Sequence, residues 1–314
     1  MASLTTRRTA AATLAGALVG AAGWASTLSA AGSPYAAQDR PRPERPLRRA
    51  HAHNDYLHER PLLDALDHGF TSFEADVHLV EGRLLVAHDL ADADPARTLE
   101  ALYLDPLAAR VRAHHGSVHP GHRRPVHLLV DIKTQGAATY RELHRRLHPY
   151  RRMLSTYGGG RVRLGAVSAV VSGDRAARAP MAAQRTRYAF LDGRLPDLAS
   201  PAPPSLIPLV SADWADSFSW TGTGPFPRAE RDALHALVRG AHRRGRRLRF
   251  WGTPDAPGPA RDALWHALLD ARVDHVNTDD LDALEEFLRR YDPQAGGRRP
   301  GRSGPGPADG GQIT

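Results

Sequence analysis

The sequence predicts a single-domain α/β protein folded as a (β/α)8 TIM barrel. Short apolar runs alternate with amphipathic stretches from about residue 47 to residue 291, and eight of the runs have the length of strands. Strands that alternate with helices along a chain are typical of a parallel sheet covered by helices. The competing architecture is a doubly wound open sheet, which is disfavoured because no glycine-rich turn follows the first run.

The eight expected strands cover residues 47–53, 71–79, 126–132, 162–170, 187–192, 205–211, 247–252 and 273–278. The clearest helical patterns cover residues 61–68, 139–148, 228–243 and 260–271. In a barrel of this kind the catalytic groups lie at the carboxyl ends of the strands. Polar residues at those ends are therefore the first candidates for a functional site.

The bulk composition suits one large globular domain, with 314 residues of which 41% are hydrophobic and 24% charged. The formal net charge of +8 comes mostly from the two ends of the chain. No single element carries a row of basic residues, so nucleic acid is not an expected partner. The chain has no cysteine, which excludes disulfides and thiolate metal sites.

The two ends of the chain differ in composition from the expected barrel of residues 39–291. In residues 1–38, Arg7 and Arg8 precede an Ala/Gly/Leu run and then small residues, which indicates an export signal peptide and spacer. The arginine pair leaves the twin-arginine route open, and an uncleaved anchor is the alternative to cleavage. We therefore expect an exported protein, secreted or associated with the cell envelope. Residues 292–314 are expected to form a disordered Gly/Pro/Arg-rich tail.

Three of the expected strands carry polar residues two positions apart. Side chains at such positions point in the same direction, because successive residues of a strand face opposite sides of the sheet. The three pairs are His51 with His53, Glu74 with Asp76, and Asp131 with Lys133. If each pair points into the barrel, all six side chains line one mouth.

Three carboxylates at one mouth would be a candidate metal site. Glu74, Asp76 and Asp131 would repel one another there unless a cation shares them. A hard divalent ion such as Mg²⁺ or Ca²⁺ binds carboxylate oxygens and leaves positions for phosphate oxygens. The alternative is a solvated strand end without a metal, and the convergence of three strands favours the metal.

Lys133 and His88 extend this site toward catalysis. Lys133 is the only lysine in a chain rich in arginine, and a compact inward charge suits contact with a phosphate or a leaving oxygen. His88 closes the run Leu-Leu-Val-Ala-His and is expected at the same mouth. Imidazole titrates near neutral pH, so His88 and either His51 or His53 form a candidate acid/base pair.

Six short motifs together resemble a known family. In order they are H-x-H-N-D-Y, E-A-D-V, V-A-H-D, V-D-I-K, F-W-G-T-P-D and N-T-D-D, within residues 48–290. Their order resembles the glycerophosphodiester phosphodiesterase and phosphatidylinositol phospholipase C-like barrels, and most of all the branch named for the fungal protein "altered inheritance of mitochondria 6".

The resemblance implies a function for these motifs. It implies that the three carboxylates bind a metal, that the histidine pair acts as acid and base, and that a neighbouring hydroxyl of the substrate attacks phosphorus to give a cyclic phosphate, which water then opens. Lys133 matches the family's lysine beside the third acid, and Trp251 matches its aromatic residue on the seventh strand.

The chain also departs from the pattern of typical glycerophosphodiesterases, which read H-R-G and then P-E-N, with the glutamate as a further metal ligand. Here Asn54 and Asp55 follow His53, P-E-N does not occur, and Glu59 is the candidate replacement. An H-x-x-N match favours His51 as the catalytic histidine, whereas a direct match to H-R-G favours His53.

Candidate substrate contacts come from three places. Asn54 follows the first strand, Trp251 ends the seventh, and Trp214 lies in the aromatic-rich segment 211–227. This segment follows the sixth strand, where it could form a wall for an apolar or sugar-like part of the substrate. The alternative is a loop that packs its own aromatic side chains.

The expected function is that of a metal-dependent phosphoric diester hydrolase that acts on a glycerophosphodiester or phospholipid-type substrate. We expect a monomer that makes transient contact with the membrane or cell envelope. One alternative is an amidohydrolase-like barrel, which also uses H-x-H and a late aspartate such as Asp279 but needs histidines on strands five and six, where residues 187–192 and 205–211 have none. The other alternative is a non-catalytic barrel that binds an envelope polyanion.

Overall fold

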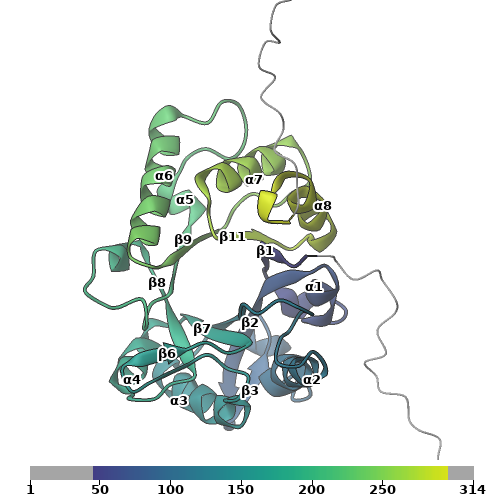
Figure 1. Ribbon diagram of the computed structural model, residues 1–314, viewed down its shortest axis with the longest axis vertical. Helices are drawn as coiled ribbons and strands as arrows, with labels where there is room; N and C mark the ends of the chain where they lie inside the picture. The colour runs from purple at the N-terminus through teal and green to yellow at the C-terminus, as the bar shows by residue number, and fades with distance from the viewer. Residues whose placement is uncertain (1–44, 296–314) are drawn as a thin grey trace, which may run out of the picture. The chain divides into compact units, whose positions relative to one another are not determined.

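Eight parallel strands close into a barrel with helices around it, as the sequence predicted (Figure 1). The computed structural model describes residues 45–295. The expected signal segment 1–38 and residues 296–314 of the expected tail lie outside the described residues. The barrel strands follow the order β1, β11, β10, β9, β8, β7, β4 and β2, and pairing of β1 with β2 closes the ring.

The barrel strands are β1 (Leu47–Ala52), β2 (Phe70–Val80), β4 (Val126–Ile132), β7 (Val167–Gly173), β8 (Ala189–Gly193), β9 (Leu209–Asp213), β10 (Arg247–Trp251) and β11 (His275–Thr278). Three further strands lie outside the ring: β3 (Arg83–Val86), which pairs antiparallel with β2, and the hairpin of β5 (Thr156–Gly158) and β6 (Arg161–Arg163). The helices are α1 (Leu63–Asp67), α2 (Asp105–Ala113), α3 (Gly136–Leu147), α4 (Arg178–Ala183), α5 (Trp214–Ser217), α6 (Arg228–Arg243), α7 (Pro259–Ala271) and α8 (Leu281–Tyr291).

Two expected strands are displaced in the structure. Residues 162–170 were expected to form one strand, but residues 161–163 belong to the β5–β6 hairpin and the barrel strand β7 begins only at Val167. Gly165 separates the two, at a place where an added Cβ would lie 2.4 Å from the Leu154 carbonyl carbon. The strand expected at 205–211 begins later, at Leu209, because Pro208 offers no backbone N–H.

The expected helices form where the apolar spacing is helical. The best example is α6, which covers residues 228–243 as predicted and buries Leu234, Val238 and Ala241. Their spacing of four and three residues places them on one face. The helix ends before Gly245, whose φ of +68° suits glycine. None of the helices within residues 45–295 has the length and apolar character needed to span a bilayer.

The barrel strands have an apolar outer side and a largely polar inner side. On β2, the buried residues Phe73, Ala75 and Val77 belong to the main hydrophobic core, while Glu74 and Asp76 between them do not. A smaller apolar cluster of Leu129, Val170 and Leu209 is separate from this core. Leu129 shares its side of β4 with Asp131, which places the small cluster on the inner side. The alternation explains why a buried strand carries carboxylates.

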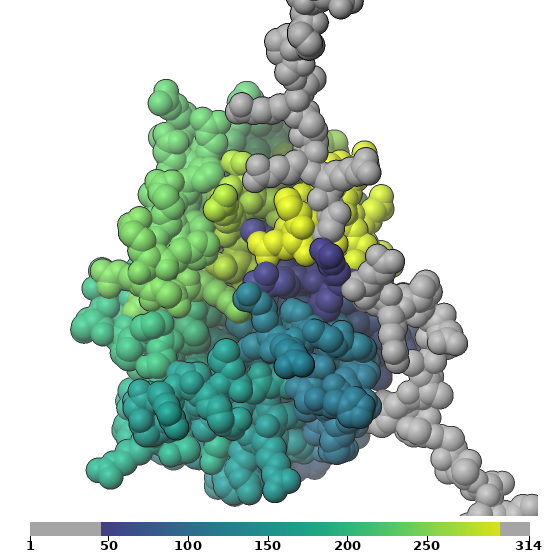
Figure 2. Space-filling view, in the orientation of Figure 1, coloured from purple at the N-terminus to yellow at the C-terminus, as the bar shows by residue number. Residues whose placement is uncertain are grey.

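The two ends of the folded chain meet beside the barrel. The purple start of the chain and the yellow last helix are neighbours in Figure 2, and β1 pairs with β11. Past α8, the buried Asp292 lies with its Oδ2 3.3 Å from Nε of Arg49, whose Nη1 donates to the Val273 carbonyl at 2.6 Å. Ordered contacts therefore extend beyond Tyr291.

We predict that Asp292→Ala lowers the free energy of unfolding by roughly 3–5 kcal/mol, because it leaves the Arg49 guanidinium buried without its counter-charge. Denaturant titration of the variant and the parent measures the difference. Glu286→Ala on α8 is the matched control, because Glu286 is exposed and its loss should change stability by no more than about 0.5 kcal/mol. Equal effects of the two substitutions would contradict the prediction.

Candidate functional site

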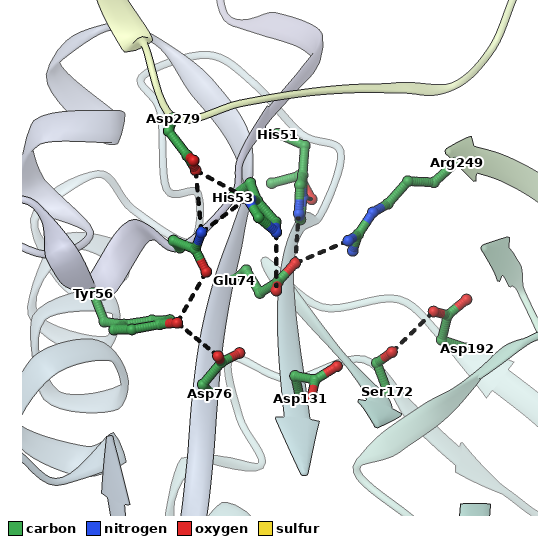
Figure 3. Close-up of polar contacts among 12 residues, drawn as sticks. His51, His53, Tyr56, Glu74, Asp76, Asp131, Ser172, Asp192, Arg249 and Asp279 are labelled. Atoms are coloured by element: carbon green, nitrogen blue, oxygen red, sulfur yellow. Dashed lines mark hydrogen bonds and ion pairs between the residues drawn. The ribbon is translucent and has the colours of Figure 1, made fainter. Parts of the chain in front are cut away.

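A cluster of charged side chains lies at the end of the barrel where the strands end, here called the C-terminal mouth. Figure 3 shows that His51 comes from β1 and His53 from the turn directly after it, while β2 contributes Glu74 and Asp76, and β4 contributes Asp131. Asp76 and Asp131 are direct neighbours in the register of β2 and β4. The residues that the sequence paired two apart therefore do meet in space.

Glu74 is the most deeply held carboxylate of the cluster. It is 5% exposed, and its Oε2 lies 3.0 Å from Nη2 of Arg249 and 3.2 Å from Nε2 of His51. Burial alone would raise the pKa of Glu74, but the charge of Arg249 and the bond from His51 hold it well below its usual range. Glu74 is therefore ionised at neutral pH.

His51 is a buried structural partner of Glu74. Its Nδ1 lies 2.7 Å from the Ser72 hydroxyl, while its Nε2 faces the ionised Glu74. Burial, with the nearby charge of Arg249, lowers the pKa of His51 to about 4. A neutral ring must therefore donate from Nε2 to Glu74 and accept from Ser72 at Nδ1. Both ring nitrogens are thus engaged, which leaves no free position for proton transfer.

His53, in the turn after β1, has a different environment from His51. Its side chain is 32% exposed, Nδ1 lies 2.9 Å from Oδ1 of Asp279, and Nε2 is 3.9 Å from Oε1 of Glu74. Burial would lower the pKa of His53, but the hydrogen bond to Asp279 and the charge of Glu74 outweigh it and raise the pKa. The Asp279 carboxylate accepts the Nδ1 proton, so Nε2 faces the cluster without a close hydrogen bond.

Asp76 connects three side chains through one oxygen. Its Oδ2 accepts from the Tyr56 hydroxyl at 2.6 Å and from Nζ of Lys133 at 2.8 Å, and it lies 3.1 Å from Nδ1 of His88. The His88 side chain is 60% exposed, so its Nε2 can reach solvent or a ligand. Burial and the charge of Glu74 raise the pKa of Asp76.

Lys133 bridges the carboxylates of two neighbouring strands. Its Nζ lies 3.2 Å from Oδ1 of Asp131 as well as 2.8 Å from Asp76. Burial would lower the pKa of Lys133, but the two carboxylates raise it, so the ammonium stays charged. Gly173 ends β7 beside them with φ +76°, and an added Cβ would lie 2.7 Å from Oδ1 of Asp131. Any larger residue at position 173 would displace the Asp131 carboxylate, so glycine is needed there.

Two carboxylate oxygens of the cluster, one of Asp76 and one of Asp131, are free to bind a hard cation. Oδ1 of Asp76 is buried without any hydrogen-bond partner, and Oδ2 of Asp131 makes no hydrogen bond in the described structure. A cation such as Mg²⁺ needs only one or two carboxylates, because waters and phosphate oxygens complete its shell. Glu74 is already neutralised by Arg249. Accordingly, no group of three or more acid, histidine or cysteine side chains in residues 45–295 is arranged as a preformed metal site.

The candidate substrate contacts divide into two kinds. Asn54 and the 37% exposed Trp251 lie at the C-terminal mouth, with Asn54 Oδ1 2.9 Å from the Tyr56 hydroxyl. The expectation for Trp214 is wrong: it is 1% exposed, and its indole N–H donates to the Trp220 carbonyl. The loop packs its own aromatic residues instead. Glu59, the candidate replacement ligand, is exposed and makes no hydrogen bond or ion pair with the cluster in the described structure.

Sequence reasoning gave no role in the phosphodiesterase site to three residues of the cluster, although its motifs H-x-H-N-D-Y and N-T-D-D contain Tyr56 and Asp279. Arg249 compensates Glu74, Tyr56 joins Asp76 to the first loop, and Asp279 orients His53. A signal for Arg249 was present, because Arg247, Arg249 and Trp251 alternate along one side of β10. Tyr56 and Asp279 follow strand ends in the loops, where spacing along the chain carries no such signal.

The arrangement suits chemistry on an anionic group. The accessible imidazoles of His53 and His88 lie beside Glu74 and Asp76 of β2, and the cations Arg249 and Lys133 form ion pairs with the same two acids. Groups that can exchange protons thus lie beside groups that stabilise negative charge.

Comparisons with known proteins agree with this chemistry. Residues 45–192 match the model of an AIM6-like phosphodiesterase domain, and residues 247–282 match the glycerophosphoryl diester phosphodiesterase family. The "Altered inheritance of mitochondria protein 6" of Eremothecium gossypii is 31% identical over 278 residues, which cover 77% of this chain and 69% of that protein. The homolog from Arthroderma benhamiae is 26% identical over 266 residues, 76% of this chain and 83% of that protein.

The loop that carries Tyr56 depends on a buried acid, Asp55. Its Oδ2 accepts from the Leu62 N–H at 2.6 Å and from the Tyr103 hydroxyl at 2.9 Å, while its Oδ1 is buried without a partner. Burial raises the pKa of Asp55 from 3.8 to about 7. The folded protein therefore keeps this proton over a pH range in which the unfolded chain has lost it.

We predict that the contribution of Asp55 to stability falls as pH rises from about 4 to about 7, because the folded state binds the Asp55 proton more tightly than the unfolded state. The loss is on the order of 4 kcal/mol at most. Asp55→Asn keeps an acceptor for Leu62 and Tyr103 but cannot ionise, so the difference in free energy of unfolding between the two proteins should change with pH over this range. Denaturant titrations at several pH values compare the two proteins, and parallel curves would contradict the prediction.

Proposed function

Because this chain belongs to the AIM6-like phosphodiesterase family, among the glycerophosphodiester phosphodiesterase-like barrels, we propose that it is a metal-dependent phosphoric diester hydrolase. One observation carries the proposal. His53 and His88 each have a carboxylate at Nδ1, Asp279 at 2.9 Å and Asp76 at 3.1 Å, which directs each Nε2 away from its carboxylate and toward the mouth. Paired imidazoles of this kind support acid/base catalysis at a phosphodiester.

His53 is the better partner for His88 in this pair. The two candidates, His51 on β1 and His53 just after it, differ in access, since the His51 side chain is 1% exposed and that of His53 is 32% exposed. His51 uses both ring nitrogens to hold Glu74 and Ser72. We therefore assign proton transfer to His53 and His88, and a positioning role to His51.

The proposed reaction needs two proton transfers. One imidazole Nε2 removes the proton from the attacking hydroxyl, whose oxygen forms a new bond to phosphorus as the bond to the leaving oxygen breaks. The other Nε2 gives its proton to that leaving oxygen. If the attacking hydroxyl belongs to the substrate, the product is a cyclic phosphate, and water opens it when the two histidines exchange roles. Asn54 and Trp251 are placed to contact the alcohol part of the substrate.

Glu74, Asp76 and Asp131 are the residues that would hold a divalent cation, Mg²⁺ or Ca²⁺, and the unpaired Oδ1 of Asp76 is the observation that supports it. When bound, such an ion supplies positive charge to the phosphoryl oxygens. Lys133 adds a second positive charge at the same carboxylates. The expected substrates are glycerophosphodiesters or phospholipid-type diesters.

No observation favours the amidohydrolase alternative. It requires histidines on β8 and β9, and these strands instead place Asp192 and Ser211 in the barrel. The non-catalytic alternative predicts ligand binding without turnover. Assays of the purified protein against glycerophosphodiesters, lysolipids and inositol lipids, with and without chelator, separate it from an enzyme.

We predict that His53→Gln and His88→Gln each lower kcat on the best diester by about 10² to 10⁴, because each removes one proton-transfer group. His115→Asn is the matched control, because His115 is exposed and lies in the loop after α2. Circular dichroism checks that all three proteins fold. Full activity of His53→Gln, together with loss in His51→Gln, would contradict the assignment to His53.

We predict that chelation abolishes turnover and that Mg²⁺ or Ca²⁺ restores it. Asp131→Asn should raise the cation concentration needed for half-maximal activity at least tenfold, because it removes one charged ligand. Glu286→Gln, which changes an exposed acid on α8, should leave that concentration unchanged. Activity that resists chelation would contradict the role of the cation while leaving the histidine pair to be judged by the previous experiment.

A further inference from the structure

Two adjoining pockets lie at the opposite end of the barrel, where the strands begin; we call this end the N-terminal mouth. The first, the basic pocket, has a volume of about 260 Å³. The second, the apolar pocket, has a volume of about 470 Å³. Arg124, Pro125 and Arg247 line both pockets, so the two share a wall.

The basic pocket holds more positive charge than its acids neutralise. Five arginines and one acid line it: Arg48, Arg49, Arg124, Arg247, Arg272 and Asp274. Arg49 is compensated by Asp292. Asp274 already accepts from Nε2 of His242 at 2.8 Å and from the Leu248 N–H at 2.9 Å.

The remaining arginines of this pocket have no acid of residues 45–295 at ion-pair distance. The side chains of Arg48, Arg124 and Arg272 form no ion pair with any residue in 45–295. Arg247 donates to the buried imidazole of His127, which is neutral because burial holds its pKa well below the ordinary value. Burial and the charges of Arg124 and Arg49 also lower the pKa of Arg48. These guanidinium groups repel one another, and a bound anion would relieve that repulsion.

The apolar pocket begins at the wall that it shares with the basic pocket. Its walls include the side chains of Val162, Leu164, Val170, Phe190, Pro204 and Pro208. Leu164 is 67% exposed beside the β5–β6 hairpin. No acid of residues 45–295 lines the pocket, so a negatively charged ligand meets no repulsion from them there.

The N-terminal mouth is separate from the candidate catalytic cluster. Thr71 lines the basic pocket, and Asp76 lies five residues further along the same strand β2, which corresponds to about 16 Å of extended chain. A ligand at one mouth therefore does not contact the histidines of the other.

We propose that the N-terminal mouth binds one molecule of a single-chain anionic amphiphile, with its charged head against Arg124 and Arg247 and its chain in the apolar pocket. A carboxylate or phosphate head suits the guanidinium groups, because both accept paired hydrogen bonds from arginine. Because the two pockets adjoin at Arg124, Pro125 and Arg247, one molecule can place its head in the basic pocket and its chain in the apolar pocket. This site goes beyond the proposed hydrolase activity and uses none of its residues.

Isothermal titration calorimetry of the full chain tests this site with four probes: decanoate, decyl phosphate, decanol and inorganic phosphate. The amphiphiles are used below their critical micelle concentrations. We expect decanoate or decyl phosphate to bind at least tenfold more tightly than decanol and inorganic phosphate. Shortening the chain to six carbons should weaken binding at least tenfold, because each buried CH₂ contributes to affinity. Equal affinity for inorganic phosphate and decyl phosphate would overturn the proposal.

Matched variants locate the binding. Arg124→Gln should weaken binding of the charged probes at least tenfold, whereas Arg123→Gln, the same change at the exposed neighbour outside both pockets, should not. Leu164→Ser should weaken binding of the ten-carbon probes, whereas Leu57→Ser, at a residue 70% exposed elsewhere, should not. Equal effects within either pair would overturn the site.

Two further measurements separate this site from the other possibilities. Binding that disappears in His88→Gln would place the ligand at the C-terminal mouth and overturn the proposal, while binding unchanged in that variant supports it whether or not the protein proves to be a hydrolase. Vesicles of phosphatidylcholine with anionic phosphatidylglycerol form the last arm. Binding to these vesicles without binding of the monomeric probes would indicate a membrane surface and would also overturn a pocket for one molecule.

Discussion

The structure depends on one constraint, the alternation of side chains along eight strands that close into a ring. Every second residue of a strand faces the helices and every other one faces the barrel interior. In this chain the outward positions are apolar and build the main core, so the fold does not require an apolar interior. Leu129, Val170 and Leu209 provide only a small apolar layer inside. The interior is thus available for charged groups.

Burial of those charged groups costs free energy, so their presence points to a role other than stability. Glu74 and Arg249 are each about 5% exposed, and an ion pair at such depth contributes little net stability compared with well-packed apolar residues. The pair holds Glu74 ionised beside Asp76, and Lys133 then balances Asp76 and Asp131. The arrangement keeps several charges close together at a place where they add little packing energy to the fold. A site of this kind is typical of catalysis rather than of stability.

The barrel interior connects two mouths of opposite character. Acids predominate where the strands end, and arginines predominate where they begin. Between them lie three buried imidazoles, with ring centroids 6.0 Å apart for His51 and His275 and 5.1 Å apart for His275 and His127. Burial lowers the pKa of each ring, so the column is neutral at physiological pH. Neutral imidazoles therefore separate the two oppositely charged ends of the barrel.

The sequence by itself determined the fold and the set of candidate groups, because strand periodicity and helical spacing are local properties of the chain. It indicated that Glu74 and Asp76 face one way and that the pairs His51/His53 and Asp131/Lys133, at the ends of β1 and β4, join them. Only the tertiary structure decided which groups touch. In it, Arg249 forms an ion pair with Glu74, Asp279 pairs with His53, and Trp214 is buried among the aromatic residues of its own loop. Those contacts depend on ring closure, strand register and loop paths, which bring residues as far as 226 positions apart within hydrogen-bond distance. No local pattern records such distances.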